Sequence, residues 1–293
     1  MTKNPLTIAD ALREAAETLR ASGVEEARRE AASLLAHVTG RDRTYLITHA
    51  DEELTEGQRA SYQSSIGRRA SGEPLQYIRG TQEFYGLDFE VNADVLIPRP
   101  ETELLVETAL GLLRETPSPL VCDMGTGSGC IGVALLHERR DARAFALDIS
   151  TRALAVAARN AARHGVAERT TFLESDCFDA LAPAGHAAAR FDLIASNPPY
   201  ISEDEMRGLQ REVREHEPRA ALTPGGDGLA VIRRLLAESP RHLKPGGHLL
   251  VEIGFGQSER VAALADPSVW TLAGIREDLQ GIPRTVVLRL KGG

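Results

Sequence analysis

Long apolar runs and runs of basic residues are both missing from this chain. No stretch approaches the roughly eighteen apolar residues that a membrane-spanning helix needs. The first residues lead into an amphipathic pattern rather than a signal peptide, so we expect a cytoplasmic protein. The formal net charge is −8, and no Lys/Arg run is present. This balance argues against a protein that grips a phosphate backbone, and it fits a protein partner or a small ligand better.

Cysteine is scarce as well. The three cysteines, Cys122, Cys130 and Cys177, match neither a CxxC motif nor the spacing of a Cys/His metal site. An odd number also does not suggest a disulfide framework. We therefore expect no metal site and interpret the cysteines as small residues of the core.

The first part of the chain shows the helical period and no convincing strand. One helix is expected to start after Thr7 and a second to run over about 25–38. Thr55 with Gln58 resembles a capping box that opens a further helix. We predict a helical bundle over residues 1–80, which either supports packing or recognises a partner.

From residue 81 onward the pattern changes. Alternating apolar and acidic residues predict a β-hairpin linker over 81–93. Strands then alternate with helices over 94–293, which predicts an α/β fold whose mostly parallel sheet is covered on both faces. The expected strands are 120–123, 144–148, 170–173, 191–195 and 248–253, with a last, antiparallel strand over 283–290 at or near the sheet edge. The expected helices lie near 129–138, 151–164, 203–215 and 227–240.

Two segments of this second domain are irregular. The prolines of residues 95–103 predict a rigid entry in which Arg99 is either a functional cation or an ion-paired residue. The alanine-rich segment 182–189 is expected to be a loop.

A glycine-rich loop, residues 123–129, follows the first predicted strand. Its glycines let the backbone approach a ligand closely, and the helix start that follows offers free N–H groups. Asp148 ends the second strand, where a carboxylate can accept both hydroxyls of a ribose. Asp176, Cys177 and Phe178 follow the third strand, where an adenine would find a hydrogen bond and a stacking face. We expect a nucleoside-bearing cofactor here; the alternative is an ordinary glycine turn with capping aspartates.

The identity of the cofactor depends on an acidic residue. Residues 127–132 formally match the GxGxxG pattern of dinucleotide-binding proteins, but a single match is weak. Asp123 precedes the glycines, where it would repel a pyrophosphate and could hold the amino group of an amino-acid moiety. This favours S-adenosylmethionine over a nicotinamide.

The stretch Ser196-Asn197-Pro198-Pro199-Tyr200 follows the fourth predicted strand. The Asn197 side chain supplies one carbonyl acceptor, and the backbone carbonyl of Pro198 supplies another, because the prolines carry no N–H. Two acceptors beside the ring of Tyr200 suit a flat –NH2 group. The stretch is therefore either a clamp for chemistry on nitrogen or a turn that ends the strand.

Motifs along nearly the whole chain resemble the release-factor glutamine methyltransferases, the PrmC/HemK family. Besides the glycine loop and Asn197-Pro198-Pro199-Tyr200, the resemblance rests on residues 72–80, 84–87, 96–103, 217–222, 225–229 and 251–254. The Asn-Pro-Pro-Tyr motif alone is shared with adenine-N6 methyltransferases of DNA. The segments 72–80 and 96–103 are more diagnostic.

The resemblance implies a seven-stranded, Rossmann-like class I methyltransferase sheet over 94–293. It also implies methyl transfer from S-adenosylmethionine to the N5 amide of the glutamine in the Gly-Gly-Gln motif of peptide-chain release factors. In some family members an aromatic residue at the position of Cys177 borders the adenine, so Phe178 is an alternative contact here. We expect a monomer that binds neither nucleic acid nor membrane.

The site residues divide into three groups. Asn197 and Pro198 are expected to be catalytic, and the glutamine is expected to be held by Asn197, Pro198, Pro199 and Tyr200. The expected cofactor contacts are Asp123, Gly125, Thr126, Gly127, Ser128, Gly129, Asp148, Asp176, Cys177, Phe178 and Asn197.

Three alternatives remain at this point. An adenine-N6 or RNA methyltransferase would use the same clamp, but it should carry a basic groove. A nicotinamide dehydrogenase would bind its dinucleotide at residues 127–132. A non-enzymatic scaffold would have little reason to keep the acceptor positions.

Overall fold

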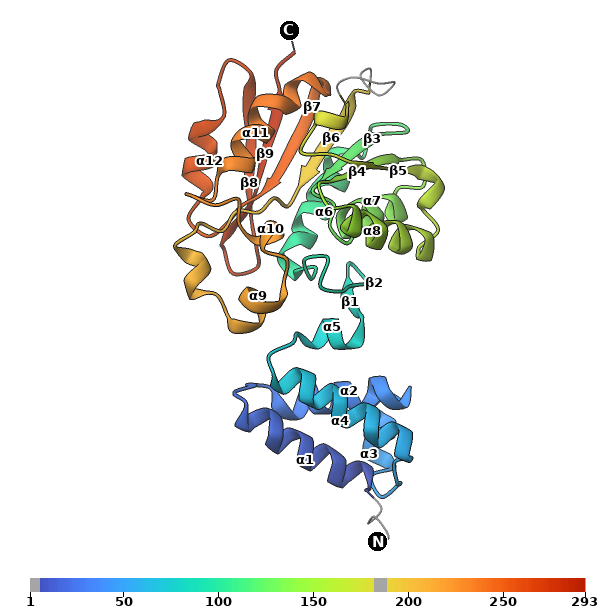
Figure 1. Ribbon diagram of the computed structural model, residues 1–293. Helices are drawn as coiled ribbons and strands as arrows, with labels where there is room; N and C mark the ends of the chain where they lie inside the picture. The colour runs from blue at the N-terminus through green and yellow to red at the C-terminus, as the bar shows by residue number, and fades with distance from the viewer. Residues whose placement is uncertain (1–5, 182–188, 293) are drawn as a thin grey trace. The chain divides into compact units, whose positions relative to one another are not determined.

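The computed structural model describes residues 6–181 and 189–292, so most of the alanine-rich segment expected as a loop lies outside the described residues. Figure 1 shows a group of N-terminal helices and a sheet covered by helices. These form two compact units. One runs to Gly80 and also contains Gln210–His216; the other comprises Thr81–Leu209 and the chain from Glu217 onward. In the described ranges no helix combines the length and the apolarity needed to cross a membrane.

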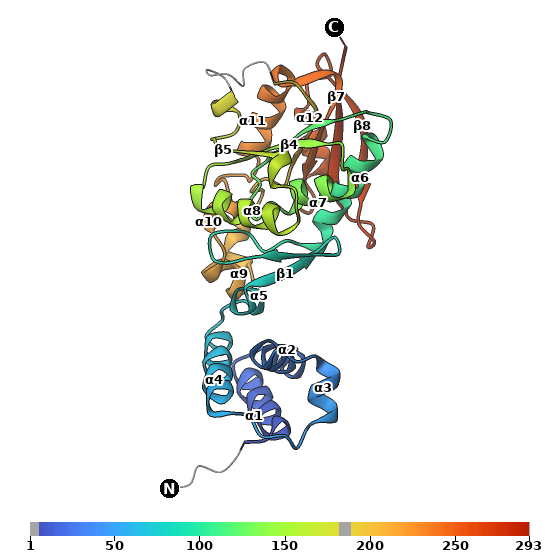
Figure 2. The same cartoon turned by 90° about the vertical axis from the view of Figure 1, so that its right-hand side faces the viewer.

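Two helices of the helical unit start at the predicted capping residues, Thr7 and Thr55. Its elements, most of them visible in Figure 2, are α1 (Ile8–Ala21), α2 (Ala27–Thr39), α3 (Arg43–Thr48), α4 (Glu56–Ala70), α5 (Leu75–Arg79) and α9 (Arg211–His216). The Thr7 hydroxyl accepts a hydrogen bond from the Asp10 amide at 3.2 Å. The capping box of Thr55 and Gln58 is also present. The predicted helices of residues 1–80 are therefore confirmed.

The single helix predicted over 203–215 is wrong. The chain instead forms the 3₁₀ turn η4 (Glu205–Gly208) and then α9, because Leu209 between them is extended, with ψ of 150°. Arg69 of α4 holds α9 in the helical unit. Its buried guanidinium contacts Glu30 of α2 and lies 2.8 Å from Glu212 of α9. Two carboxylates offset the cost of burying this charge.

The predicted hairpin is formed by β1 (Thr81–Phe84) and β2 (Leu87–Glu90), which pair antiparallel. Its turn residues Tyr85 and Gly86 have φ of 53° and 73°, the left-handed pair that two-residue hairpin turns require. Phe84 and Phe89 are buried in the same apolar cluster as residues of the second unit's helices.

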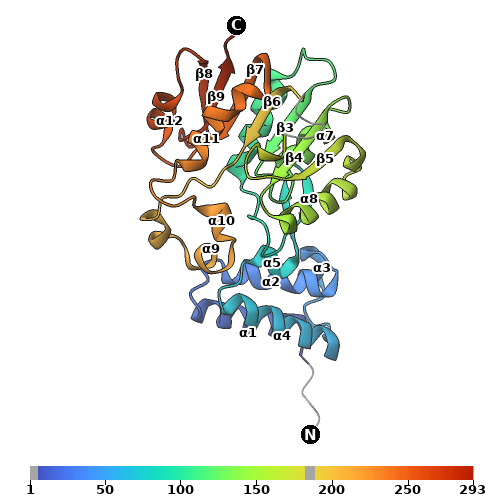
Figure 3. The same ribbon diagram turned by 45° about the horizontal axis from the view of Figure 1, so that its top comes forward.

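The sheet of the second unit has seven strands in the order β5-β4-β3-β6-β7-β9-β8, which Figure 3 shows side by side. They are β3 (Leu120–Met124), β4 (Arg143–Asp148), β5 (Thr170–Glu174), β6 (Phe191–Ser196), β7 (Leu243–Glu252), β8 (Trp270–Glu277) and β9 (Pro283–Leu290). The strands β3 to β7 are parallel, and β9 is antiparallel to its neighbours β7 and β8. This confirms the predicted α/β fold with a mostly parallel sheet.

Helices cover both faces because successive strand residues point to opposite sides. Val121, Leu193 and Leu250 belong to one apolar cluster, and their chain neighbours Cys122, Ile194 and Leu249 belong to the other. The first cluster is covered by α6 (Glu103–Leu112), α7 (Cys130–Glu138) and α8 (Thr151–Arg163), and the second by α11 (Ala230–Glu238) and α12 (Ser258–Leu264).

The sequence analysis placed no strand at β8. Trp270 is the one buried residue among the eight of this strand, so the alternation that marks a half-buried strand is absent. As the edge strand, β8 moves β9 to the second position from the edge.

Candidate active site

A cavity of about 440 Å³ lies at the carboxyl ends of four parallel strands. Its lining includes the residues that directly follow β3, β4, β5 and β6, together with parts of 93–102 and 218–224. Ligands of open α/β sheets bind at this edge. The lining contains ten of the residues predicted for the site: Gly125, Thr126, Gly127, Ser128, Asp148, Asp176, Cys177, Asn197, Pro198 and Pro199.

The glycine loop bends sharply at the end of β3. The amides of Gly125 and Thr126 both donate to the Leu147 carbonyl, at 2.8 and 2.9 Å. Gly129 has φ of 82° and begins α7; a Cβ on it would lie 3.1 Å from that of Ala157 on α8. Only glycine allows both this conformation and this approach.

Asp123 shapes the loop from beneath rather than lining the cavity. Its Oδ2 accepts hydrogen bonds from the Thr126 hydroxyl at 2.7 Å and from the Gly132 amide at 2.9 Å. Burial raises the pKa of this carboxyl to about 6. Its Oδ1 is buried and has no hydrogen-bond partner, so an acceptor is left over beside the loop.

Asp148 is both anchored and accessible from the cavity. Its Oδ2 accepts from the Gly127 amide at 2.8 Å, and its Oδ1 accepts from the Ser150 amide at 2.9 Å. Burial raises the pKa of the carboxyl, and these backbone hydrogen bonds oppose that rise. Each oxygen has a lone pair left, so a ribose diol fits the carboxylate.

The residues after β5 separate into lining and non-lining positions. Asp176 lines the cavity, and its carboxylate is held by Arg234 at 2.6 Å. Cys177 also lines the cavity, with φ of 50°, and burial raises the pKa of its thiol to about 11. Phe178 does not line the cavity: its ring is buried and stacked on His242 at 4.8 Å. Cys177 is thus the better placed of the two alternatives.

Ile149 is a lining residue that the sequence analysis did not consider. Its side chain is 62% exposed and borders the cavity directly after Asp148. An apolar side chain exposed beside a ribose-binding carboxylate is suited to cover a base. The signal available in the sequence was its place immediately after the strand-ending aspartate.

The Asn-Pro-Pro-Tyr stretch follows β6 as predicted. The Nδ2 of Asn197 donates to the Thr102 hydroxyl at 3.1 Å, which leaves Oδ1, on the other side of the planar amide, as a free acceptor. Tyr200 is not a lining residue; its hydroxyl donates to Glu252 at 3.2 Å, and burial raises the pKa of this phenol.

Two glycine motifs pack against this stretch. A Cβ on Gly228 would lie 2.3 Å from the Tyr200 carbonyl oxygen, and one on Gly254 would lie 3.1 Å from the Tyr200 ring. The Tyr200 carbonyl also accepts a hydrogen bond from the Gln257 side chain at 2.9 Å. The chain therefore requires glycine at position 228, and Gly254 is closely packed against the Tyr200 ring.

Arg99 is ion-paired and also lines the cavity. Its guanidinium bonds to Glu217, whose other oxygen accepts from the Ile97 amide at 3.2 Å. The Glu217 side chain is 1% exposed. This buried carboxylate joins the proline-rich entry to the segment that precedes α10 (Arg219–Leu222).

Known proteins resemble this chain over nearly its whole length. Residues 10–80 match the family model "PrmC N-terminal domain", and residues 100–236 match "Methyltransferase small domain". The chain is 45% identical to a release factor glutamine methyltransferase of Nitratidesulfovibrio vulgaris, over 97% of this chain and 95% of that protein. It is 46% identical to one of Burkholderia pseudomallei, over 95% of this chain and 96% of that protein.

Solved structures were also compared. The protein-(glutamine-N5) methyltransferase from Alicyclobacillus acidocaldarius is 30% identical, covering 69% of this chain and 99% of that one, with a TM-score of 0.45. The catalytic domain of hMettl16 in complex with an RNA hairpin is 16% identical, covering 78% and 81%, with a TM-score of 0.55. The second similarity shows a shared fold and nothing finer.

Proposed function

Because the chain belongs to the release factor glutamine methyltransferases, we propose that its cavity places the cofactor beside the glutamine of a release factor's Gly-Gly-Gln motif. The enzyme is an S-adenosylmethionine-dependent protein-(glutamine-N5) methyltransferase. One observation carries the proposal: the Asn197 acceptor and the glycine loop line the same cavity. The two curated relatives named above are both release factor glutamine methyltransferases, which favours glutamine over the alternative of an adenine-N6 methyltransferase.

The residues present fit the cofactor. Asp148 would accept the ribose hydroxyls, the backbone of Gly125 to Ser128 would surround the amino-acid moiety, and Cys177 with Ile149 would border the adenine. The unpartnered Oδ1 of Asp123 supplies a negative charge beneath the loop, complementary to an ammonium. When bound, S-adenosylmethionine supplies an electrophilic methyl group on a sulfonium.

The clamp supplies orientation. The lone pair of an amide nitrogen is delocalised, so the glutamine is a poor nucleophile, and positioning must provide much of the rate. Asn197 Oδ1 and the Pro198 carbonyl would each accept one N–H of the glutamine amide. Both acceptors also stabilise positive charge that develops on nitrogen during transfer. The departing proton becomes acidic only as the new bond forms, so no strong base is required.

The direct experiment uses labelled S-adenosylmethionine and an intact release factor. We expect label in the release factor with native Gly-Gly-Gln and none in its Gln→Ala version. Equal labelling of both would contradict glutamine specificity.

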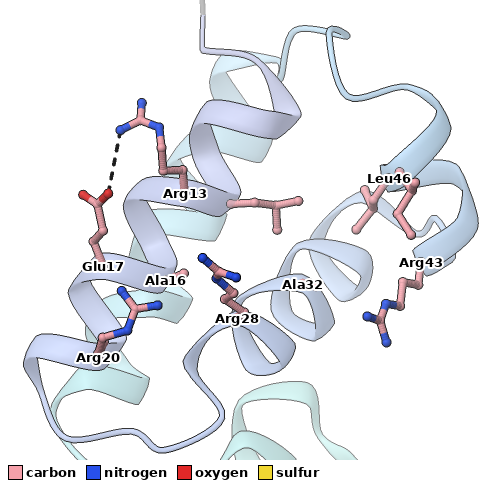
Figure 4. Close-up of a pocket in the computed structure, with 10 residues that line it drawn as sticks. Arg13, Ala16, Glu17, Arg20, Arg28, Ala32, Arg43 and Leu46 are labelled. Atoms are coloured by element: carbon pink, nitrogen blue, oxygen red, sulfur yellow. Dashed lines mark ion pairs between the residues drawn. The ribbon is translucent and has the colours of Figure 1, made fainter.

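We also propose that the helical unit recognises the release factor. This unit carries a cleft of about 340 Å³. Figure 4 shows arginines around its apolar floor. At its rim a guanidinium nitrogen of Arg13 lies 4.0 Å from a carboxylate oxygen of Glu17. Its apolar lining includes Leu46 and Ile47, and Ile47 is 68% exposed. Arg20, Arg28 and Arg43 complete the basic rim. An acidic segment with an apolar side chain complements this surface.

A charge reversal tests this recognition. Arg20→Glu combined with Arg28→Glu should raise KM for the release factor and leave methylation of a short Gly-Gly-Gln peptide unchanged. Arg29→Glu is the matched control, since Arg29 is exposed on the same helix and outside the cleft. An unchanged KM for the full release factor would remove the cleft from recognition.

We propose further that the enzyme acts as a monomer in the cytoplasm, where translation factors work, without binding nucleic acid or membrane. The net charge of −8 supports a protein substrate over a nucleic acid. Light scattering at working concentration checks the oligomeric state.

A further inference from the structure

A buried carboxylate contacts the clamp formed by Asn197, Pro198, Pro199 and Tyr200, and the function proposed above assigns it no role. Glu252 is the last residue of β7 and is 2% exposed. Its Oε1 accepts the hydrogen bond from the Tyr200 hydroxyl, and its Oε2 is buried without a hydrogen-bond partner. The Thr102 hydroxyl acts on the same carboxylate and stabilises its charge. A carboxylate is costly to bury unless it is paired and hydrogen-bonded.

The three side chains around Glu252 form a connected series. Asn197 Nδ2 donates to Thr102 Oγ1, so the Thr102 proton remains available for the carboxylate. A carboxylate only accepts hydrogen bonds, whereas a hydroxyl can do either. The carboxylate therefore sets the direction of every hydrogen bond in the series. The Tyr200 proton is directed at Glu252, the Thr102 oxygen accepts from Asn197, and the Thr102 proton can turn to the carboxylate.

This direction determines what Asn197 presents to the cavity. With Nδ2 turned to Thr102, the side-chain carbonyl faces the glutamine site as an acceptor. The opposite orientation would present an NH2 group to the NH2 group of the substrate. Resting on the function proposed above, we infer that Glu252 is a positioning residue for methyl transfer, which orients Asn197 through Thr102 and holds Tyr200 directly.

The protonation state of Glu252 should make this role visible in the pH dependence of methylation. Burial raises the pKa of its carboxyl to about 7, against the lowering effects of Thr102, Tyr200 and Arg284. The charge of Glu101 raises this pKa further. Cys130 on α7 also interacts electrostatically with Glu252, and Thr285 of β9 is the residue paired with Glu252 in the sheet. A protonated Glu252 would donate a hydrogen bond and disturb the series. The methylation rate should rise with pH through about 7 and then level off.

The test is Glu252→Gln, which keeps the shape and removes the charge. At saturating cofactor we expect kcat to fall about 10-fold, less than the roughly 100-fold loss from removing a direct contact. We also expect the rise near pH 7 to disappear while cofactor affinity stays within about 3-fold. Saturating cofactor separates this titration from that of Asp123.

The control is Thr285→Val, which alters a buried neighbour of Glu252 outside the series. It should keep the wild-type kcat and pH profile. Tyr200→Phe and Thr102→Val should each lower kcat, and adding Thr102→Val to Glu252→Gln should cost little more, because residues of one network are not additive. These two variants keep the inference testable if Glu252→Gln unfolds.

The outcomes separate the two proposals. An inactive wild-type enzyme toward Gly-Gly-Gln would overturn the proposed function itself. An active wild type with Glu252→Gln matching it in kcat and pH profile would overturn only the positioning role. Equal losses in Glu252→Gln and Thr285→Val would do the same, since they would reflect packing.

Discussion

The side-chain amide of Asn197 donates a hydrogen bond of 3.1 Å to the hydroxyl of Thr102, a residue 95 positions earlier in the chain. This contact ties the clamp after β6 to the proline-rich entry of the same unit. Because the nitrogen of the amide is used, its oxygen is left for the cavity.

Removing the Asn197 side chain should slow methyl transfer strongly. Asn197→Ala deletes one preorganised acceptor, which should raise the barrier by about 2.7–4 kcal/mol, a rate loss of roughly 10²–10³. Single-turnover methylation of a release factor measures this loss. Cofactor binding by calorimetry should change little, and near-normal turnover would refute the clamp.

Replacing Tyr200 should weaken glutamine positioning more than cofactor binding. Tyr200 contacts Glu252 and the Gly254 backbone and is not a lining residue of the cavity. Tyr200→Ala should therefore loosen the clamp and raise KM for the release factor or lower kcat. The dissociation constant of the cofactor is the comparison. An equal loss in both quantities would contradict the division of roles.

The substitution Gly228→Ala should damage both stability and activity. Its Cβ would lie 2.3 Å from the Tyr200 carbonyl oxygen, so the backbone of the clamp must move. We expect the free energy of unfolding to fall by about 1–3 kcal/mol more than in the control. Gly225→Ala is that control, because Gly225 has nearly the same φ, 80° against 79°, and nothing lies within 4 Å of its Cβ. Equal effects on chemical denaturation would show that only backbone strain matters.

Neutralising Asp148 should weaken cofactor binding. Asp148→Asn turns an NH2 group toward either the Gly127 or the Ser150 amide, both of which now donate to the carboxylate. The loss of a charge-assisted hydrogen bond, about 1.5–3 kcal/mol, predicts a roughly 10- to 100-fold higher Kd. Titration calorimetry with S-adenosylmethionine measures it. If the Asp148→Asn variant binds S-adenosylmethionine with an unchanged Kd, Asp148 only supports the structure of the glycine loop.

Stability should fall as pH rises through about 6 to 7. Burial raises the pKa of Asp123 to about 6 and that of Glu252 to about 7. A carboxyl with a raised pKa favours folding fully below its ordinary pKa, and this contribution is lost as pH rises through the folded value. Asp141, with a pKa lowered to about 2, is ionised throughout this window and adds no slope.

Urea denaturation at about pH 5 and pH 8 tests this dependence. From pH 5 to pH 8 the stability should fall by roughly 1 kcal/mol through Asp123 and by roughly 2–3 kcal/mol through Glu252, because about one and two pH units remain below their folded pKa values. Glu252→Gln should remove its share, and Thr285→Val should keep the wild-type slope. If the free energy of unfolding of the wild type did not change with pH, ionisation of these two carboxyls would not destabilise the folded protein.

Several features of this protein could be predicted from local sequence. The helix starts at Thr7 and Thr55, the turn at Gly86 and the glycine loop each depend on chemistry within a few residues. The buried parallel strands could be predicted because their apolar runs are continuous. β8 escaped prediction, since an edge strand with one buried residue has no such pattern, and the helix expected over 203–215 failed at the extended Leu209.

The sequence by itself determined which groups are available: two acceptors in Asn197-Pro198, a glycine loop, and a carboxylate at the end of β4. Only the tertiary structure decided how they are aimed. Thr102 and Glu252 carry no local signal, because their roles come from contacts with residues far away in the chain. The direction of a hydrogen bond is a property of two partners, and here the partners meet only when β6, β7 and the proline-rich entry fold together.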